Sequence, residues 1–483
     1  MFPSDGCLLL ESKMNTSVFD AYELPDGIKC PQMLNSVNVG EGFSVQYPSL
    51  NDSDKDVLAK ILVEGNAAIK NMPVSEIIQS IGKVSERFMD QDDPLRHKAL
   101  EIMVPTAGIS IEMAETILAG MSADWTKTKL TELLEKEFRI PAILDGFQRI
   151  DSGRSQMASG FTFNLTVGSG TVPGVGVTAL IRALLLKSSI LIKPGLGDVA
   201  LPVLFARALK EESEVFEKCL AVAYWDGAKE KIGDEILGKA GVVVVYGSDE
   251  TIRSIRSQIP KTIDLVAYGQ RLGIGLVGRE ALSGMKALKT AQRVAMSISI
   301  FDQKGCVSPQ ILYVEEDGEV APEDWVELLA SAMERLEEKL PLGVLNQQEV
   351  IRVQQLRAAT ELQEMAGTGV SLYEGKHKSW TVIFDPELSL KWSDCKRAVY
   401  VKPIPDLTVV KTLLANNENC LQTVAMAGAF SRKEDIANDL SQVGVTRLTS
   451  FRQAPWPKPW WHHDGRSVFQ GLFKLIDIED ISD

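Results

Sequence analysis

The sequence has few cysteines, and they are not grouped. Its 483 residues include six, at positions 7, 30, 219, 306, 395 and 420, with no CxxC pair and no metal-ligand spacing. This scatter argues against both a cysteine-rich metal site and a disulfide framework. In a chain of this size we expect reduced thiols in the cytosol.

Long hydrophobic runs and excess positive charge are also absent. The longest apolar run, Val177 to Ile192, contains Arg182 and Lys187, so we do not expect a membrane span. The first five residues lack the basic start and apolar stretch of a signal peptide, which predicts a cytoplasmic protein. A net charge of −14 disfavours non-specific binding to nucleic acid or anionic membranes.

The length predicts two or three domains. Residues 1–50 are rich in Asn, Ser, Gly and Pro, and we expect an irregular segment with a few short strand-like pieces. Helical apolar spacing follows from Ser53 to about Lys136, and an extended stretch near 138–167 predicts a hairpin. We place the domain boundaries at 51–280 and 281–447, with a Trp- and Pro-rich strap over 448–483.

Strands of nearly continuous Val and Ile alternate with helices in the middle of the chain. The expected strands are 189–193, 219–224 and 242–246, and the expected helices are 177–186, 199–211, 228–237 and 250–258. This alternation predicts an α/β fold with a parallel, doubly wound sheet. A second alternating block contains the expected helices 282–300 and 323–339 and the expected strands 310–314, 380–384 and 398–404.

Cys306 lies between an expected helix and an expected strand, beside Gly305 and small polar residues. A thiol at such a junction is exposed to a ligand yet held by regular structure, as nucleophilic thiolates are. A free cysteine that simply packs as a small hydrophobe is the alternative.

Several glycine-rich turns are candidates for phosphate binding. Gly247 and Ser248 end a strand and open a helix, which suits a phosphate cradle, although Asp249 and Glu250 are equally a plain helix-start signal. The loop 168–176 allows close approach of a ligand or is a tight connection. Lys193 ends a buried strand. Its ammonium group there either faces a ligand or extends past apolar surface to reach water.

Two other motifs are weaker. Residues 273–278 match GxGxxG, but the segment itself has the pattern of a strand, so we do not expect a dinucleotide loop there. His462, His463 and Asp464 are adjacent, and adjacent side chains rarely converge on one ion. We therefore predict no metal site.

In order and spacing, several motifs resemble the acyl-CoA reductases of the LuxC family, within the aldehyde dehydrogenase superfamily. The matching stretches are Val172-Pro-Gly-Val-Gly176, Ile192-Lys-Pro194, Ala223-Tyr-Trp225, Val245-Tyr-Gly-Ser-Asp-Glu-Thr-Ile252, Phe301-Asp-Gln-Lys-Gly-Cys-Val-Ser-Pro-Gln310 and Trp461-His-His-Asp-Gly465. The resemblance spans roughly residues 160–470. It implies an aldehyde dehydrogenase-like fold, with a Rossmann-type nucleotide domain, an α/β catalytic domain and a small oligomerisation hairpin.

The resemblance also implies roles for individual residues. Cys306 would accept the acyl group, and the nucleotide would lie across the doubly wound sheet. Lys193 would face the adenosine ribose or its phosphate, and Gly247, Ser248 and Gly269 would line the cofactor site. Thr171 stands where the superfamily has its oxyanion-hole Asn, and its hydroxyl would donate instead.

Two absences refine the implied reaction. Aldehyde-oxidising relatives have a water-activating Glu where this chain has Ala267, so acyl transfer or hydride reduction is favoured over hydrolysis. They also have an acidic residue where Leu196 stands, so a 2′-phosphate meets no repulsion and NADPH is expected. Gln270 stands where a His is expected in the family.

The expected function is NADPH-dependent reduction of a long-chain fatty acyl-CoA, or another acyl thioester, to a fatty aldehyde through a Cys306 acyl-enzyme. The alternatives are a hydrolytic aldehyde dehydrogenase and a non-catalytic acyl- or nucleotide-binding subunit. The resemblance further implies a homo-oligomer and an acyl-activating synthetase as partner.

Overall fold

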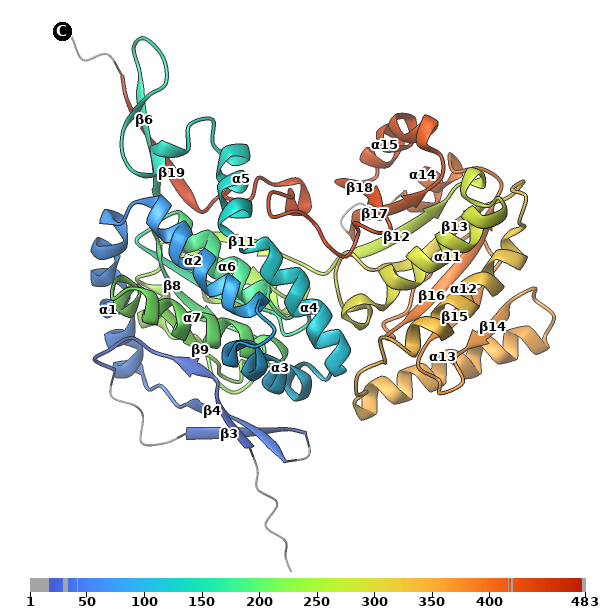
Figure 1. Ribbon diagram of the computed structural model, residues 1–483, viewed down its shortest axis with the longest axis horizontal. Coiled ribbons are helices and arrows are strands. Elements are labelled where there is room, and N and C mark those ends of the chain that lie inside the picture. Colours follow the sequence, from blue (N-terminus) through green and yellow to red (C-terminus); the bar gives the residue numbers. More distant parts are fainter. Residues whose placement is uncertain (1–16, 29–33, 41, 416, 418–419, 480–483) are drawn as a thin grey trace, which may run out of the picture.

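The computed structural model describes residues 17–28, 34–40, 42–415, 417 and 420–479. Within these residues the chain forms an α/β protein whose strands make four sheets. The two largest, of six and seven strands, lie in separate lobes, one coloured mainly blue to green and the other yellow to orange (Figure 1). The α/β class predicted from the sequence is confirmed.

The six-stranded sheet is doubly wound. Its order is β11-β10-β7-β8-β9-β2, and all neighbours run parallel except β2 with β9. The chain builds outward from β7 and then crosses back to β10, so the topological switch point lies between these two strands. The strands are β2 (Tyr22–Glu23), β7 (Phe163–Val167), β8 (Ser189–Lys193), β9 (Leu220–Ala223), β10 (Val242–Tyr246) and β11 (Asp264–Tyr268).

Helices cover both faces of this sheet. Every residue of β7, β9 and β10 is buried, as the apolar runs predict. Right-handed crossovers place α6 (Val175–Leu185) and α7 (Ala200–Glu212) on one face and α10 (Asp249–Gln258) on the other. The expected helical region is present as α1 (Asp52–Asn71), α2 (Val74–Met89), α3 (Pro94–Ala107), α4 (Ile111–Asp124) and α5 (Lys127–Glu137).

The seven-stranded sheet has the order β14-β15-β16-β13-β12-β17-β18, and only β14 is antiparallel to its neighbour. Its strands are β12 (Leu272–Val277), β13 (Pro309–Glu315), β14 (Ser371–Glu374), β15 (Thr381–Phe384), β16 (Ala398–Ile404), β17 (Leu421–Ala427) and β18 (Arg447–Ser450). The GxGxxG stretch is therefore strand β12, as expected. The boundary placed at residue 280 falls one strand too late, because β12 already belongs to the second sheet.

Among the described residues, the last three helices of the second lobe were not predicted from the sequence. The helices of this lobe are α11 (Gly284–Ser299), α12 (Pro322–Glu337), α13 (Gln347–Met365), α14 (Val409–Leu414) and α15 (Lys433–Ser441). In α13 only Val353, Arg357 and Thr360 are buried. Because two of these three side chains are polar, α13 lacks the apolar periodicity that predicts a helix.

The helix expected over 228–237 was wrong for its first half. The structure has two short helices in this part of the chain, α8 (Val215–Cys219) and α9 (Asp234–Leu237). Gly233 adopts a left-handed φ of 99°, and the Asp226 carboxylate accepts a hydrogen bond from the Ala228 backbone N–H at 3.1 Å. Both features favour a turn over a helix.

The N-terminal segment, expected to be irregular, is largely extended where it is described. β1 (Ser17–Asp20), β4 (Phe43–Pro48) and β3 (Leu34–Gly40) form a sheet in that order. Phe43, Val45 and Tyr47 alternate toward the core, and this burial stabilises a strand despite its polar surroundings. Residues 1–16, with Cys7, and residues 29–33, with Cys30, lie outside the described residues.

The C-terminal segment returns from the second lobe to the first. In Figure 1 it runs in red from β18 toward β19 (Phe473–Ile478), which pairs antiparallel with β6 (Ser155–Gly160). β6 also forms a hairpin with β5 (Gln148–Arg149). The hairpin expected near 138–167 is thus β5–β6, whereas β7 enters the six-stranded sheet.

The described helices are too short or too polar to cross a membrane singly. Helices α3 and α4 meet the length and composition criteria only as a pair, and the pair is bent by 118°.

Glu315, at the end of β13, is a fully buried carboxylate that joins several segments of the second lobe. Arg432 donates to both of its oxygens at 2.7 and 2.8 Å, and the backbone N–H groups of Arg279 and Leu407 donate at 2.8 and 3.0 Å. Burial alone would raise the pKa of Glu315, but these hydrogen bonds hold it well below its ordinary value.

We expect Glu315→Ala to lower the free energy of unfolding by about 3 kcal/mol, because it removes the buried acceptor of two backbone N–H groups and of the partly exposed Arg432 guanidinium. The depressed pKa stabilises the folded state above the ordinary value of 4.5, and this contribution is lost as the pH falls through the folded-state pKa. Urea unfolding at pH 7 and pH 4 measures both effects. The exposed neighbour variant Glu316→Ala should stay within about 0.5 kcal/mol of wild type; equal losses in the two variants would contradict this account.

Candidate active site

The residues expected to bind a nucleotide come together at one edge of the six-stranded sheet. Lys193 ends β8, Gly247 and Ser248 follow β10, and Gly269 follows β11. In a doubly wound sheet the carboxyl ends of the strands beside the switch point form the ligand crevice. The topology therefore brings four residues, widely separated in sequence, to the same edge.

The ammonium group of Lys193 lies close to two aromatic rings at this edge of the sheet. Its Nζ lies 5.3 Å from the centre of the Tyr224 ring and 5.9 Å from that of Trp225. Burial lowers the pKa of Lys193, while the charge of Asp226 opposes the shift. The position suits a phosphate or ribose, and the rings beside it limit the motion of the ammonium group.

Gly247 and Ser248 form the N-terminal entry to α10. A Cβ at Gly247 would come within 3.1 Å of Thr251, a spacing that disfavours any larger residue. The Ser248 hydroxyl caps the helix by accepting a hydrogen bond from the Thr251 N–H at 3.3 Å. The helix-start reading of this motif is therefore correct, and the open backbone at Gly247 still permits close approach of a phosphate.

The loop 168–176 packs closely on the loop that follows β8. Cβ atoms at Gly195 and Gly197 would overlap the backbone of Gly170. At the start of α6, the buried Asp198 carboxylate accepts hydrogen bonds from the N–H groups of Gly174 and Gly176 at 2.7 and 2.8 Å. Burial raises the pKa of Asp198 to about 7. These glycines thus make a tight connection, and a carboxylate already occupies this helix N-terminus.

Cys306 is half-buried in the turn between η4 (Ile300–Gln303) and β13. Burial, and to a lesser extent the negative charge of Asp464, raise the pKa of its thiol to about 11. Arg271 and Arg447 oppose the shift. The sequence did not show which group lowers the pKa of this thiol. In the structure two guanidinium groups lower it, and one carboxylate opposes their effect.

Arg271 and Asp464 form an ion pair that joins distant segments beside Cys306. Arg271, in the connection from β11 to β12, donates to Asp464 from Nε at 3.0 Å and from Nη2 at 2.8 Å. Gln422, on β17, donates to the same carboxylate at 2.6 Å. Asp464 lies in η7 (His463–Gly465) of the C-terminal segment and has a left-handed φ of 53°.

Arg447, the first residue of β18, is the second cation near Cys306. It donates to the carbonyl oxygens of Gln453 and Ala454 at 2.7 and 3.0 Å, and it lies over the Trp461 ring at 5.2 Å. In the part of the chain that the structure describes, no carboxylate pairs with it. Burial lowers the pKa of Arg447 to about 10, and the nearby Cys306 opposes this shift.

A stack of rings connects this charged cluster to the nucleotide edge. Tyr268, at the end of β11, stacks on Tyr246 at 4.8 Å and on His463 at 4.5 Å, and His463 stacks on Trp461 at 4.6 Å. Burial lowers the pKa of His463 to about 4, so the ring is neutral at physiological pH. Its Nε2 is buried and has no hydrogen-bond partner among the described residues.

The remaining predicted positions lie near the same sheet edge. Thr171 is exposed, and its hydroxyl lies 3.1 Å from that of Ser169. Ala267, on β11, offers no carboxylate, and its carbonyl accepts a hydrogen bond from Arg466 at 3.3 Å. Gln270 is exposed. The oxyanion role of Thr171 stays a prediction.

Sequence reasoning missed Arg271, Gln422 and Arg447, and it noted Asp464 only within a matching motif and as part of a rejected metal-binding group. A single Arg or Gln on a strand or in a linker carries no local signal. The motif 461–465 was the one usable hint, because its position in a family pattern pointed to a role. No group of three or more potential metal ligands occurs in the described ranges.

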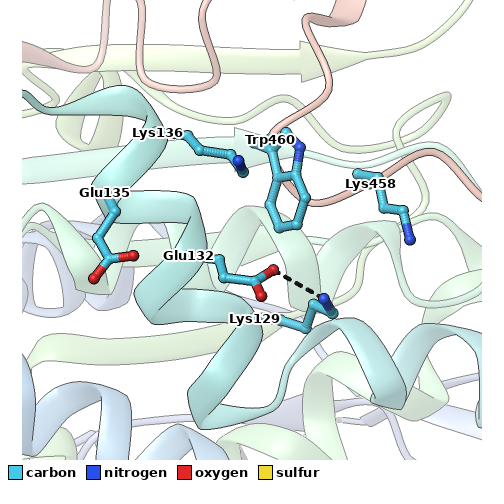
Figure 2. Close-up of a pocket in the computed structure, with 6 residues that line it drawn as sticks. All are labelled: Lys129, Glu132, Glu135, Lys136, Lys458 and Trp460. Atoms are coloured by element: carbon cyan, nitrogen blue, oxygen red, sulfur yellow. Dashed lines mark hydrogen bonds and ion pairs between the residues drawn. The ribbon is translucent and has the colours of Figure 1, made fainter.

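A surface pocket of about 450 Å³ lies away from these residues. Figure 2 shows Lys129, Glu132 and Lys136 of helix α5 on the side of Lys458 and Trp460 of the C-terminal segment, with Glu135 of the same helix pointing away from them. Lys129 and Lys136 lie 5.3 and 4.9 Å from the centre of the Trp460 ring. None of the predicted site residues lines this pocket, which marks where the segment crosses α5.

Comparisons with known proteins agree with this geometry. The family model described as acyl-CoA reductase (LuxC) matches residues 69–475. The chain is 23% identical to a long-chain acyl-protein thioester reductase of Photobacterium phosphoreum, covering 90% of this chain and 86% of the relative. It is also 23% identical to the same-named protein of Aliivibrio fischeri, covering 93% of each.

Solved structures define the fold. The aldehyde dehydrogenase KauB from Pseudomonas aeruginosa superposes with a TM-score of 0.73 at 13% identity, covering 92% of this chain and 93% of the other. An NADP-dependent glyceraldehyde-3-phosphate dehydrogenase from Bacillus halodurans, complexed with NADP, gives 0.70 at 12% identity, covering 93% and 96%.

The fold is therefore that of the aldehyde dehydrogenases. The chain belongs to the LuxC family of acyl-CoA reductases. It is an oxidoreductase of the kind that acts on acyl thioesters and aldehydes.

The charges around Cys306 predict how its reactivity depends on pH. In the free protein we expect alkylation by iodoacetamide to rise with a midpoint near pH 11. Asp464→Asn removes the negative charge and frees Arg271, so the midpoint should fall. At neutral pH the rate should then increase about tenfold for each unit of that fall, because the thiolate is the reactive form. Arg447→Gln should raise the midpoint.

Mass spectrometry of the Cys306 peptide distinguishes this thiol from those of Cys219, Cys395 and Cys420, and a Cys306→Ala protein gives the background. Identical midpoints in wild type and both variants would show that these charges do not act on the thiol.

Proposed function

We propose that the protein reduces a long-chain acyl thioester to a fatty aldehyde, with NADPH as hydride donor and Cys306 as the acyl acceptor. The observation that carries the proposal is the placement of Cys306 next to two guanidinium groups, with a ring stack linking this cluster to the carboxyl edge of the nucleotide sheet. Family membership supports the reaction type.

The reaction begins with attack of the Cys306 thiolate on the incoming thioester. Arg447 and Arg271 favour this thiolate, and the donor thiol leaves as the acyl group moves to Cys306. Exchange of one thioester for another is nearly isoenergetic, so the acyl-enzyme keeps its reactivity. After reduction, collapse of the thiohemiacetal on Cys306 expels the thiolate and forms the aldehyde. The backbone N–H of Cys306 and the Thr171 hydroxyl are the proposed donors to the oxyanion.

The residues at the sheet edge suit a pyridine dinucleotide, which when bound supplies the hydride. Gly247 leaves room for the pyrophosphate, Ser248 orders the helix behind it, and Lys193 supplies a positive charge. We propose NADPH over NADH because Leu196, at the start of η2 (Leu196–Asp198), presents no carboxylate to a 2′-phosphate.

Leu196→Glu tests the choice of nucleotide. We expect KM for NADPH to rise at least about tenfold, because a carboxylate near the 2′-phosphate costs more than about 1.4 kcal/mol of binding. The KM for NADH should change little. Steady-state kinetics with both nucleotides measure the ratio, and Leu196→Gln is a control of similar size without charge. Equal effects on both nucleotides would argue against this placement of the 2′-phosphate.

The acyl donor was expected to be acyl-CoA or another thioester. The relatives in Photobacterium phosphoreum and Aliivibrio fischeri are named for acyl-protein thioesters, so we propose an acyl group carried on a protein as the physiological donor. An acyl-activating synthetase is the proposed source. We also propose a cytoplasmic homo-oligomer, and the exposed Leu475, Ile476 and Ile478 on β19 support an interface there.

The decisive experiment follows radiolabelled acyl groups from acyl-protein and acyl-CoA donors. We expect label on Cys306 of the wild type, release of fatty aldehyde when NADPH is added, and at least about 10³-fold less turnover in Cys306→Ala. Wild-type protein without label and without thioester-dependent NADPH oxidation would refute the proposal. Free acid in place of aldehyde would indicate the hydrolytic alternative, which the absence of a carboxylate at Ala267 disfavours.

A further inference from the structure

The turn that leads into Cys306 has an unfavourable backbone. Phe301, Asp302 and Gln303 have φ values of 57°, 48° and 64°, and none is glycine. Left-handed backbone brings the Cβ of such residues too close to the neighbouring carbonyl oxygen. Three consecutive residues in this region persist only where surrounding contacts over-determine them. The contacts of this turn therefore decide where the thiol, three residues further on, is held.

The side chain of Gln303, at the start of the Cys306 turn, is hydrogen-bonded to the strand at the end of the turn and to a neighbouring strand. Its Nε2 donates to the Pro309 carbonyl at 2.7 Å and to the Ala398 carbonyl at 2.9 Å, and its Oε1 accepts from the Ala398 N–H at 2.7 Å. Pro309 begins β13 and Ala398 begins β16. One buried amide thus fixes the residue before the turn to the strand after it and to the neighbouring strand.

Asp302 forms a second anchor with Arg397, which is fully buried like Asp302 itself. Nε and Nη2 of Arg397 donate to Asp302 Oδ1 at 3.0 and 2.7 Å, and the N–H of Gly343 donates to Oδ2 at 3.2 Å. Arg397 also donates to Glu337 at 2.7 Å. Arg397 itself has a left-handed φ of 47°, so both Asp302 and Arg397 have a strained backbone.

We propose that Gln303, Asp302 and Arg397 are positioning residues that hold Cys306 where it meets the acyl donor and the hydride. This inference rests on the proposed function. The three side chains act on the backbone on either side of the thiol and not on the thiol itself. Without them Phe301–Gln303 can relax toward right-handed backbone and carry Cys306 with them. A displacement of about 1 Å at a reacting atom costs about 10²-fold in rate.

The test compares Gln303→Ala and Arg397→Lys with a matched control. Arg397→Lys keeps the charge but loses the fork that reaches two partners. The control is Asp385→Asn, which weakens the pair of Asp385 and Lys402, joined at 3.0 Å and equally buried in the same sheet. Each folded protein is assayed for its melting temperature, NADPH dissociation constant, kcat, and alkylation of Cys306 by iodoacetamide across pH.

We expect all three variants to melt at lower temperature and to bind NADPH as wild type does. Only the Gln303 and Arg397 variants should lose about 10²-fold in kcat and show an altered pH profile of Cys306 alkylation. If Gln303→Ala does not fold, Asp302→Asn takes its place, since it keeps the shape of the side chain and removes the ion pair.

The inference would be overturned if the positioning variants kept the kcat and the alkylation profile of the wild type. In that case they would lose only stability, as Asp385→Asn does. The alkylation profile does not depend on acyl chemistry. It therefore still tests the positioning role if wild-type protein proves unable to reduce thioesters, and the two proposals fail separately.

Discussion

The ion pair of Arg271 and Asp464 is the contact on which the arrangement of the site depends. It joins the connection between the two large sheets to the C-terminal segment, and Gln422 adds a strand of the second sheet to the same carboxylate. The Asp464 side chain is only 8% exposed, and a carboxylate so buried is stable only when its partners are in place. The pair therefore holds three distant segments together within electrostatic reach of Cys306.

The same contact influences the ionisation of Cys306, the proposed nucleophile. Asp464 neutralises Arg271, so Arg447 is the cation left to favour a thiolate, and the free protein keeps Cys306 protonated. The ring stack through Tyr268 and His463 lies between this cluster and the nucleotide edge. A protonated resting thiol is protected from oxidation and alkylation, since the thiolate is the reactive form. Movement of the Asp464 charge away from the thiol would favour ionisation, because that charge raises the pKa of Cys306.

The sequence predicted the parallel strands well and the peripheral elements poorly. β8, β10 and β16 match their predicted bounds, because strands buried on both faces must be apolar at nearly every position. Helix α13 was missed because little of it is buried, and the bounds of β4 were not predicted because its short alternating pattern stands among polar residues. The boundary at 280 was wrong because β12 looks the same whichever sheet it joins.

For the site, the sequence by itself determined the chemical groups and their order: a cysteine after a helix, glycines and a lysine at strand ends, and no carboxylate at Ala267 or Leu196. The cysteine, the glycines and the lysine are local signals that residue type and spacing suffice to find, whereas the absences at Ala267 and Leu196 are visible only through the family resemblance. Only the tertiary structure decided that Arg271, Arg447 and Asp464 surround Cys306, because they lie on segments up to 193 residues apart whose meeting depends on the packing of both sheets. The pKa of Cys306 follows from that packing, since burial and neighbouring charge are properties of the folded chain.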